Sequence, residues 1–145
     1  MSLSTSNDDP LAVRLAEFAI ATSAGDIPAV AFERAKMSLA STVASAAMGF
    51  AIPSARIIRA LDLRAGGAPS STVWFDGTLL PPGAAARVNA VASDAAASDD
   101  SDLRSIAHIG TIVSTVSLAL GQRLEASGAD ILAAMVVGYA IAGRI

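Results

Sequence analysis

The segment MSLASTVASAAMGFAIPSA, residues 37–55, carries no charged side chain and is long enough to approach a membrane span. It consists largely of Ala, Ser, Thr and Gly, with Pro53 near its end. Transfer of such residues into a bilayer is far less favourable than transfer of a run of Leu, Ile or Phe. We therefore predict that this segment is a buried helix in an all-helical core and that the protein does not enter a membrane.

The composition fits one soluble domain with an unusually apolar surface. A chain of 145 residues can bury a sizeable core. Apolar residues make up 53% of the chain and charged residues only 16%, so we expect part of the apolar surface to contact a partner. The net charge of −3 and the single lysine, Lys36, exclude a nucleic-acid partner, which would need clustered basic side chains.

The chain contains no cysteine, which excludes a disulfide framework and a thiolate metal site. This absence is compatible with a reducing cytoplasm. The first ten residues, MSLSTSNDDP, are polar and acidic, unlike the basic start of a secretory signal. We expect a cytoplasmic protein.

Capping residues and prolines divide the chain into helices. The segment TVWFDGTLL, residues 72–80, places β-branched and aromatic residues around Asp76-Gly77, a strong hairpin signal. The prediction is an all-α, multi-helix domain with one short β-hairpin. We predict helices from Asp9-Pro10 to about Thr22, from a cap at Asp26 to Gly49, from Pro53 to about Arg64, from Pro81-Pro82 through Val91, from just after His108, and from a capping box at Ser127–Asp130 onward.

Several predicted helices show regular faces. In the third, we expect Ile57, Ile58 and Leu61 to point inward, and the fifth carries a seam of Val113, Val116, Leu120 and Leu124. In the last helix Ala134, Gly138 and Ala142 recur every fourth residue and form a groove that another helix could enter. No later sequence remains to fill this groove, so we expect the chain to be the first part of something larger.

The stretch ASDDSDLRSIAHIG, residues 97–110, concentrates three aspartates, Arg104 and the only histidine, His108. A histidine can act as acid or base near neutral pH because its ordinary pKa is about 6.5. At a helix N-terminus, free N–H groups favour a bound carboxylate, and Arg104 can pair with one. Taken alone, His108 is better explained as a capping or hydrogen-bonded structural histidine.

The aspartates Asp99, Asp100 and Asp102 also suggest a metal site, since clustered carboxylates suit Mg²⁺ or Ca²⁺. Their spacing lacks both a glycine turn and a distal bidentate glutamate. We predict no metal; a solvated acidic loop, with Asp102 capping a short helix, explains the cluster more simply.

Several segments, in this order, resemble the N-terminal helical domain of the MmgE/PrpD family, which includes 2-methylcitrate dehydratase, cis-aconitate decarboxylase and iminodisuccinate epimerase. They are IPAVAFERAK, AAARVNAVA, NAVASDAAASDDSD, AHIG and SGADILAAMVVGYAIAGRI. Family members are longer, with an all-helical domain, a smaller α+β domain and a site in the cleft between them. The resemblance implies that residues 1–145 are an incomplete helical domain that lacks the family's C-terminal part and forms one wall of the site.

The family's acidic motif has an aspartate, an aromatic residue, two aspartates and a threonine, and it corresponds here to residues 97–101. Asp99 and Asp100 are kept, Ser101 replaces the threonine, and Ala97 replaces the first aspartate. Asp94 stands where the family commonly has a histidine. The family's His-Pro-Gly element corresponds to residues 108–110, with the proline lost.

This mapping, together with the loop chemistry, defines the candidate site. The candidate catalytic residues are His108, Asp99 and Asp100, and the candidate substrate-binding residues are Arg104, Ser101 and Asp94. We expect the two aspartates to hold the loop and polarise a neighbour rather than to transfer the proton, because several anionic groups would repel an anionic substrate.

Family reactions remove a proton next to a carboxylate, or a carboxyl group, from small di- or tricarboxylic acids without metal or organic cofactor. The resemblance implies part of a cofactor-independent lyase or isomerase that catalyses dehydration, epimerisation or decarboxylation. We expect the isolated chain to be inactive, because one wall of a cleft cannot exclude water. The expected partners are a small carboxylic acid, a second copy of the chain and/or a second chain that supplies the missing part. The alternative is a non-catalytic accessory subunit or truncated paralogue that retains the helical dimerisation surface.

Overall fold

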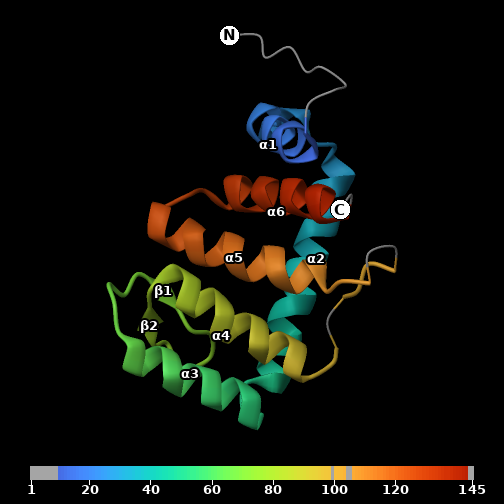
Figure 1. Ribbon diagram of the computed structural model, residues 1–145. Coiled ribbons are helices and arrows are strands. Elements are labelled where there is room, and N and C mark those ends of the chain that lie inside the picture. The colour runs from blue at the N-terminus through green and yellow to red at the C-terminus, as the bar shows by residue number, and fades with distance from the viewer. Residues whose placement is uncertain (1–9, 99, 104–105, 144–145) are drawn as a thin grey trace.

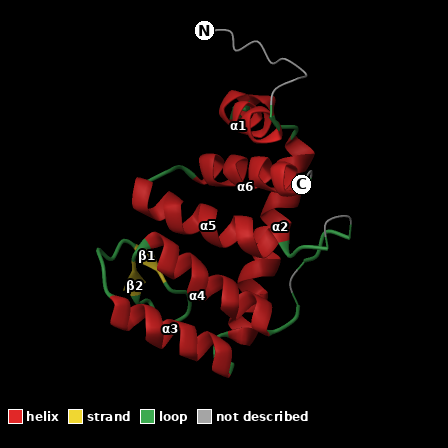
Figure 2. Cartoon of the chain, viewed as in Figure 1, coloured by secondary structure: helices red, strands yellow, loops and turns green. Residues whose placement is uncertain are grey.

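The computed structural model describes residues 10–98, 100–103 and 106–143. These residues form helices joined by short loops, with one two-stranded sheet (Figures 1 and 2). The prediction of an all-α domain with one short hairpin is confirmed. The elements are α1 (Leu11–Ala21), a 3₁₀ turn η1 (Ala24–Asp26), α2 (Ala29–Gly49), α3 (Pro53–Ala65), β1 (Ser71–Thr72), β2 (Leu79–Leu80), α4 (Pro82–Ala95), α5 (Ile109–Leu124) and α6 (Gly128–Ala142).

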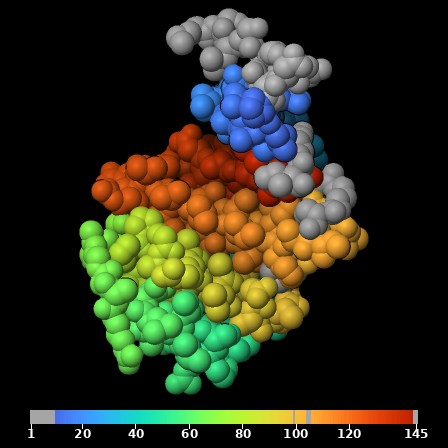
Figure 3. All heavy atoms as spheres, in the orientation of Figure 1, coloured from blue at the N-terminus to red at the C-terminus, as the bar shows by residue number. Residues whose placement is uncertain are grey.

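Four helices stack side by side in the order α3, α4, α5, α6, and α2 crosses the stack (Figure 1). Each helix of the stack contacts the next, while α2 contacts α4, α5 and α6. The space-filling view shows the stack as successive bands, with α1 at the end beside α6 (Figure 3). Helix α2 is therefore the one element that joins the layers.

The apolar segment of residues 37–55 is not one continuous helix. Helix α2 ends at Gly49, and α3 starts at Pro53 at an angle of 94° to it. Pro53 occupies the first turn of α3, where a missing N–H breaks no helical hydrogen bond. In the part of the chain that the structure describes, no single helix is long and apolar enough to cross a bilayer, and α2 with α3 meets that test only as this bent pair.

Hydroxyl side chains fill much of the interface between α2, α4 and α5. Ser45 Oγ donates to the carbonyl oxygen of Ser93 at 2.8 Å, and Thr42 Oγ1 donates to Ser114 Oγ at 3.4 Å. The hydroxyls of Ser93 and Thr111 lie 3.2 Å apart. A buried hydroxyl without a partner destabilises a fold, so these bonds fix the register of the three helices.

Helices α2 and α4 approach most closely at Gly49. A Cβ atom at this position would collide with the carbonyl oxygen of Ala92 and lie 3.3 Å from the nitrogen of Ala96. Gly49 itself is buried. The crossing therefore requires a residue without a side chain at this point.

The hairpin is attached to the stack by side-chain hydrogen bonds. Asn89 Oδ1 accepts a bond from the nitrogen of Trp74 at 2.9 Å, and Asn89 Nδ2 donates to the carbonyl oxygen of Thr72 at 3.0 Å. Ser71 Oγ donates to the carbonyl oxygen of Ala119 at 2.6 Å. The strands pair over only two residues each, in the register Ser71↔Leu80 and Thr72↔Leu79, and Asp76-Gly77 lies in the loop between them.

The prediction that Asp26 caps the second helix is wrong. Asp26 closes the preceding 3₁₀ turn, where its Oδ2 accepts bonds from Ser23 Oγ at 2.6 Å and from the Ser23 nitrogen at 2.9 Å. These two donors lower the pKa of Asp26. Helix α2 starts after Pro28 without a side-chain cap. By contrast, the predicted capping box of Ser127 and Asp130 at the start of α6 is confirmed.

On α3 and α5, most of the apolar residues that were predicted to face the core are exposed instead. Ile57 and Leu61 of α3 are 61% and 52% exposed, and only Ile58 of the predicted trio packs on the core. Along the predicted seam of α5, Val116, Leu120 and Leu124 are exposed. The reason is that α3 and α5 pack through small or polar residues, which allow closer contact between helices than Ile or Leu side chains do. These buried residues are Ala55 and Asp62 on α3 and Thr111, Ser114, Thr115 and Ala119 on α5.

Two further expectations need correction. The groove expected on the last helix is not empty, because Val113 of α5 packs against Gly138, where an added Cβ would lie 3.0 Å from Val113 Cγ1. Helix α4 continues beyond the predicted end at Val91 to Ala95, so Asp94 belongs to its last turn rather than to the loop. Contacts within the chain thus occupy part of a surface that the sequence suggested was open.

Replacing Gly49 with alanine should lower the free energy of unfolding by about 1–3 kcal/mol, because the added methyl group must displace the backbone of α4. Denaturant titration followed by circular dichroism measures this change. Gly83→Ala in α4 is the matched control, since nothing lies within 4 Å of a Cβ at Gly83. Equal destabilisation by both substitutions would contradict a tight crossing at Gly49.

Candidate functional site

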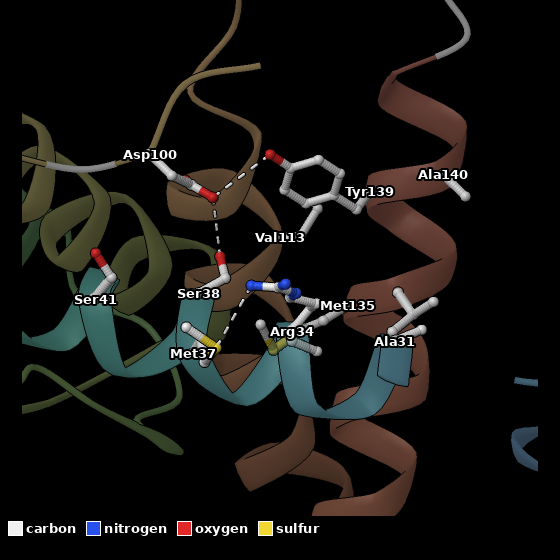
Figure 4. A pocket seen from close by; sticks show the side chains of 12 residues that line it. Ala31, Arg34, Met37, Ser38, Ser41, Asp100, Val113, Met135, Tyr139 and Ala140 are labelled. Carbon is white, nitrogen blue, oxygen red and sulfur yellow. Dashed lines mark hydrogen bonds between the residues drawn. The ribbon is translucent and has the colours of Figure 1, made fainter. Parts of the chain in front are cut away.

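A cavity of about 690 Å³ lies between α2, α5 and α6 (Figure 4). Its walls are mainly apolar, and polar groups come from a few side chains. The lining residues are Ala31, Arg34, Ala35, Met37, Ser38 and Ser41 of α2, Asp100 of the loop after α4, Val113 of α5, and Met135, Val136, Tyr139 and Ala140 of α6. Of the four predicted site residues that the structure describes, only Asp100 is in this set.

The carboxylate of Asp100 connects two walls of the cavity. Its Oδ2 accepts a hydrogen bond from Ser38 Oγ of α2 at 3.1 Å and lies 3.5 Å from the Tyr139 hydroxyl of α6 (Figure 4). Its Oδ1 is buried and has no hydrogen-bond partner among the described residues. Oδ1 is enclosed by the protein, because it packs against Gly110 at the start of α5.

Asp100 also packs against the first turn of α5. A Cβ at Gly110 would overlap the carboxylate of Asp100, so the glycine makes room for the acid. Gly110 is the second residue of α5, where the helix dipole stabilises a negative charge. Gly110, two residues after His108, is therefore required for the position of the Asp100 carboxylate.

Arg34 is the only cation among the described residues that line the cavity. It forms no ion pair with any carboxylate in the described ranges, and its Nη1 lies 4.0 Å from Met37 Sδ. Arg34 and Ser38 are four residues apart on α2, so they share one face of that helix. The cavity therefore combines the guanidinium of Arg34 with the carboxylate of Asp100.

Three other predicted site residues, all of them described, lie outside the cavity. His108 is exposed at the residue before α5, and its side chain does not cap the helix. Asp94 is exposed on α4, and Ser101 is exposed in the loop. Asp99 and Arg104 fall outside the described residues. Among the residues that are described, no group of three or more His, Asp or Glu side chains is placed to hold a metal ion.

Four polar residues of the cavity were not predicted from the sequence: Arg34, Ser38, Ser41 and Tyr139. The first three lie in the segment predicted to be a core helix, and Tyr139 lies on α6. The available signal was the spacing of Arg34 and Ser38 by one helical turn, which places a charge and a hydroxyl on one face. No local signal linked that face to Asp100, 62 residues later.

The described residues form a stack of helices crossed by a single long helix, with an acidic loop at the edge of an apolar cavity. The family model for the MmgE/PrpD N-terminal domain matches residues 13–145. This chain belongs to the MmgE/PrpD family. No curated protein and no solved structure matched it in the corresponding comparisons.

Gly110→Ala should displace the Asp100 carboxylate and break its contacts with Ser38 and Tyr139. Tyr139 is the only tyrosine, so its ring resonances are identified directly by NMR and should shift. The free energy of unfolding should fall by about 1–3 kcal/mol. Gly128→Ala, at the start of α6, is the control because a Cβ there meets nothing within 4 Å. Unchanged Tyr139 resonances in Gly110→Ala would show that Asp100 does not depend on this glycine.

Proposed function

We propose that this chain forms one wall of the site of a cofactor-independent lyase or isomerase, which removes a proton next to the carboxylate of a small carboxylic acid. Family membership supports this proposal, since the family includes dehydratases and related enzymes. The observation that carries it is that the carboxylate of Asp100, bound by Ser38 through Oδ2, and the guanidinium of Arg34 line the same cavity. A carboxylic acid in this cavity can pair with Arg34.

The substrate carboxylate would pair with a guanidinium, because this planar group binds a carboxylate through two parallel hydrogen bonds. Arg34 is suitably placed in the cavity, and Arg104 remains a predicted second ligand. Asp100 repels the carboxylate and accepts a bond from a hydroxyl or amine instead. Together the two charges orient the substrate in one direction.

In this proposal His108 accepts the proton. It precedes Gly110, the residue on which Asp100 packs, by two positions and so lies at the same end of α5. Its imidazole takes the proton from the carbon next to the substrate carboxylate, and the electron pair moves into that carboxylate as an enolate. In a dehydration the electron pair then expels the β-hydroxyl group, which leaves with a proton as water. In an epimerisation the carbon regains a proton on its other face.

The predicted roles of the remaining residues belong to the same proposal. Asp99 holds the loop. Ser101 and Asp94 bind the part of the substrate that extends beyond the cavity. We place the reaction in the cytoplasm, because a chain without cysteine suits a reducing compartment.

His108→Gln should lower turnover by roughly two to four orders of magnitude, the usual contribution of a positioned acid or base. The assay uses the native assembly purified from its own cells and follows exchange of the proton next to the carboxylate by NMR in deuterated water. Arg123→Gln, at the far end of the same helix, is the control and should keep full activity. Full activity of His108→Gln at an unchanged melting temperature would make His108 a structural residue.

A second candidate function is that of a non-catalytic accessory subunit that keeps only the interface. It is favoured by the exposed seam of α5, in which Ile112 takes the place of the predicted Val113, so that its residues recur every fourth position. The exposed fractions are 56% for Ile112, 42% for Val116, 46% for Leu120 and 71% for Leu124. A contiguous apolar face of this kind is typical of a surface that contacts another protein, and we propose a second copy of the chain as its partner.

Sedimentation should therefore show a dimer at micromolar concentration. Leu120→Glu should dissociate it, because a charge would be buried in the contact. Leu63→Glu on α3, a residue of similar exposure, is the control and should leave the dimer intact. A monomer at this concentration would count against the seam as an interface.

A further inference from the structure

We propose that Ser38 and Tyr139 are positioning residues for His108. Both act through the carboxylate of Asp100, which stands at the start of the turn that ends at His108. The inference rests on the proposed function, in which His108 accepts the proton, and it adds two residues to that reaction. Neither of them needs to touch the substrate for this role.

The carboxylate of Asp100 is held from three sides. Ser38 Oγ of α2 donates to its Oδ2 at 3.1 Å, and the Tyr139 hydroxyl of α6 lies 3.5 Å from the same oxygen (Figure 4). Its Oδ1 packs against Gly110 of α5, where a Cβ would overlap it. Three helices therefore determine where Asp100 lies, and two of them do so through a single hydroxyl group.

The turn between Asp100 and His108 is closed by backbone hydrogen bonds. The Asp102 nitrogen donates to the carbonyl oxygen of Ala107 at 2.9 Å, and the Ile106 nitrogen donates to the carbonyl oxygen of Asp102 at 2.8 Å. Ala107 directly precedes His108. A displacement of Asp100 therefore reaches His108 through residues that the structure describes: along the chain to Asp102, across the hydrogen bond to Ala107, and along the chain again.

The backbone of this turn is strained at Ile106. Its φ is 53°, in the left-handed region that β-branched residues rarely adopt. The side chain is 89% exposed, so its own burial does not offset the strain. A strained residue persists only where the surrounding structure over-determines it. The hydrogen bonds that close the turn, and the contacts of Asp100 before it, hold the turn in this shape.

The position of His108 matters because a base must lie within hydrogen-bond reach of the proton that it removes. A displacement of about 1 Å can lower turnover roughly a hundredfold. Loss of the Ser38 or Tyr139 hydroxyl should therefore lower kcat. It should leave KM unchanged, because the substrate carboxylate still binds at Arg34.

The test is NMR of the untagged protein with isotope-labelled histidine. His108 is the only histidine, so its ring resonances are identified directly. Ser38→Ala and Tyr139→Phe should each shift these resonances, and the double variant should shift them further. In the native assembly, each single variant should lower the kcat of proton exchange by roughly ten- to a hundredfold at an unchanged KM.

Two further serine substitutions separate positioning from a general loss of stability. Ser71→Ala removes a buried hydrogen bond to the carbonyl oxygen of Ala119, eleven residues along the chain from His108. It should lower the melting temperature and change neither the His108 resonances nor kcat. Ser38→Thr keeps the hydroxyl, and its methyl group has room in the cavity, so it should restore both the resonances and the turnover.

The outcomes separate this inference from the proposed function. Unshifted His108 resonances in both single variants and in the double variant overturn the inference, whatever the activity. An equal shift in Ser71→Ala also overturns it, because loss of stability alone would then explain the effect. Shifted resonances in Ser38→Ala, together with full activity of His108→Gln, support the positioning of His108 and overturn the proposed proton transfer.

Discussion

At Gly49 the backbone of α2 lies against the carbonyl oxygen of Ala92, and closer to the start of α2 Ser45 and Thr42 bury hydroxyls against α4 and α5. These contacts require small residues and have a single register, because a shift of one residue along the helix would turn the hydroxyls away from their partners. The rest of the molecule is arranged around this crossing: α3, α4, α5 and α6 stack in order, and α2 holds α4, α5 and α6 together.

The same face of α2 continues into the cavity. Arg34, Ser38, Thr42, Ser45 and Gly49 follow one another at intervals of three or four residues, which is one stripe of a helix. The register fixed at the Gly49 end therefore also determines where Ser38 and Arg34 lie. Ser38 in turn binds Asp100, so the acidic loop takes its position from a helix crossing at the other end of α2.

The sequence predicted the helices well because caps, prolines and glycines act locally: Pro53 starts α3, and Ser127 with Asp130 starts α6. The predictions of which helix faces are buried were wrong, because contacts between helices determine burial. Ile57 and Leu61 look like core residues, yet the stack buries Ala55 and Asp62 instead, and Asp62 is held by a bidentate pair with Arg87 that raises the pKa of that guanidinium. The cavity could not be predicted from the sequence, because its walls come from three helices that are far apart along the chain. Family resemblance led to Asp100, but only the fold shows which residues surround it.

The long spacing of these contacts has a consequence for synthesis of the chain. Ser45 meets its partner 48 residues later, Ser38 meets Asp100 62 residues later, and Thr42 meets Ser114 72 residues later. Helix α2 therefore leaves the ribosome long before its partners, with its polar stripe hydrated and its apolar side chains uncovered. Such distant contacts form slowly and leave the nascent chain exposed to aggregation. The cavity needs Met135 and Tyr139 of α6, so it can form only after α2, the loop after α4, and α5 have all been synthesised.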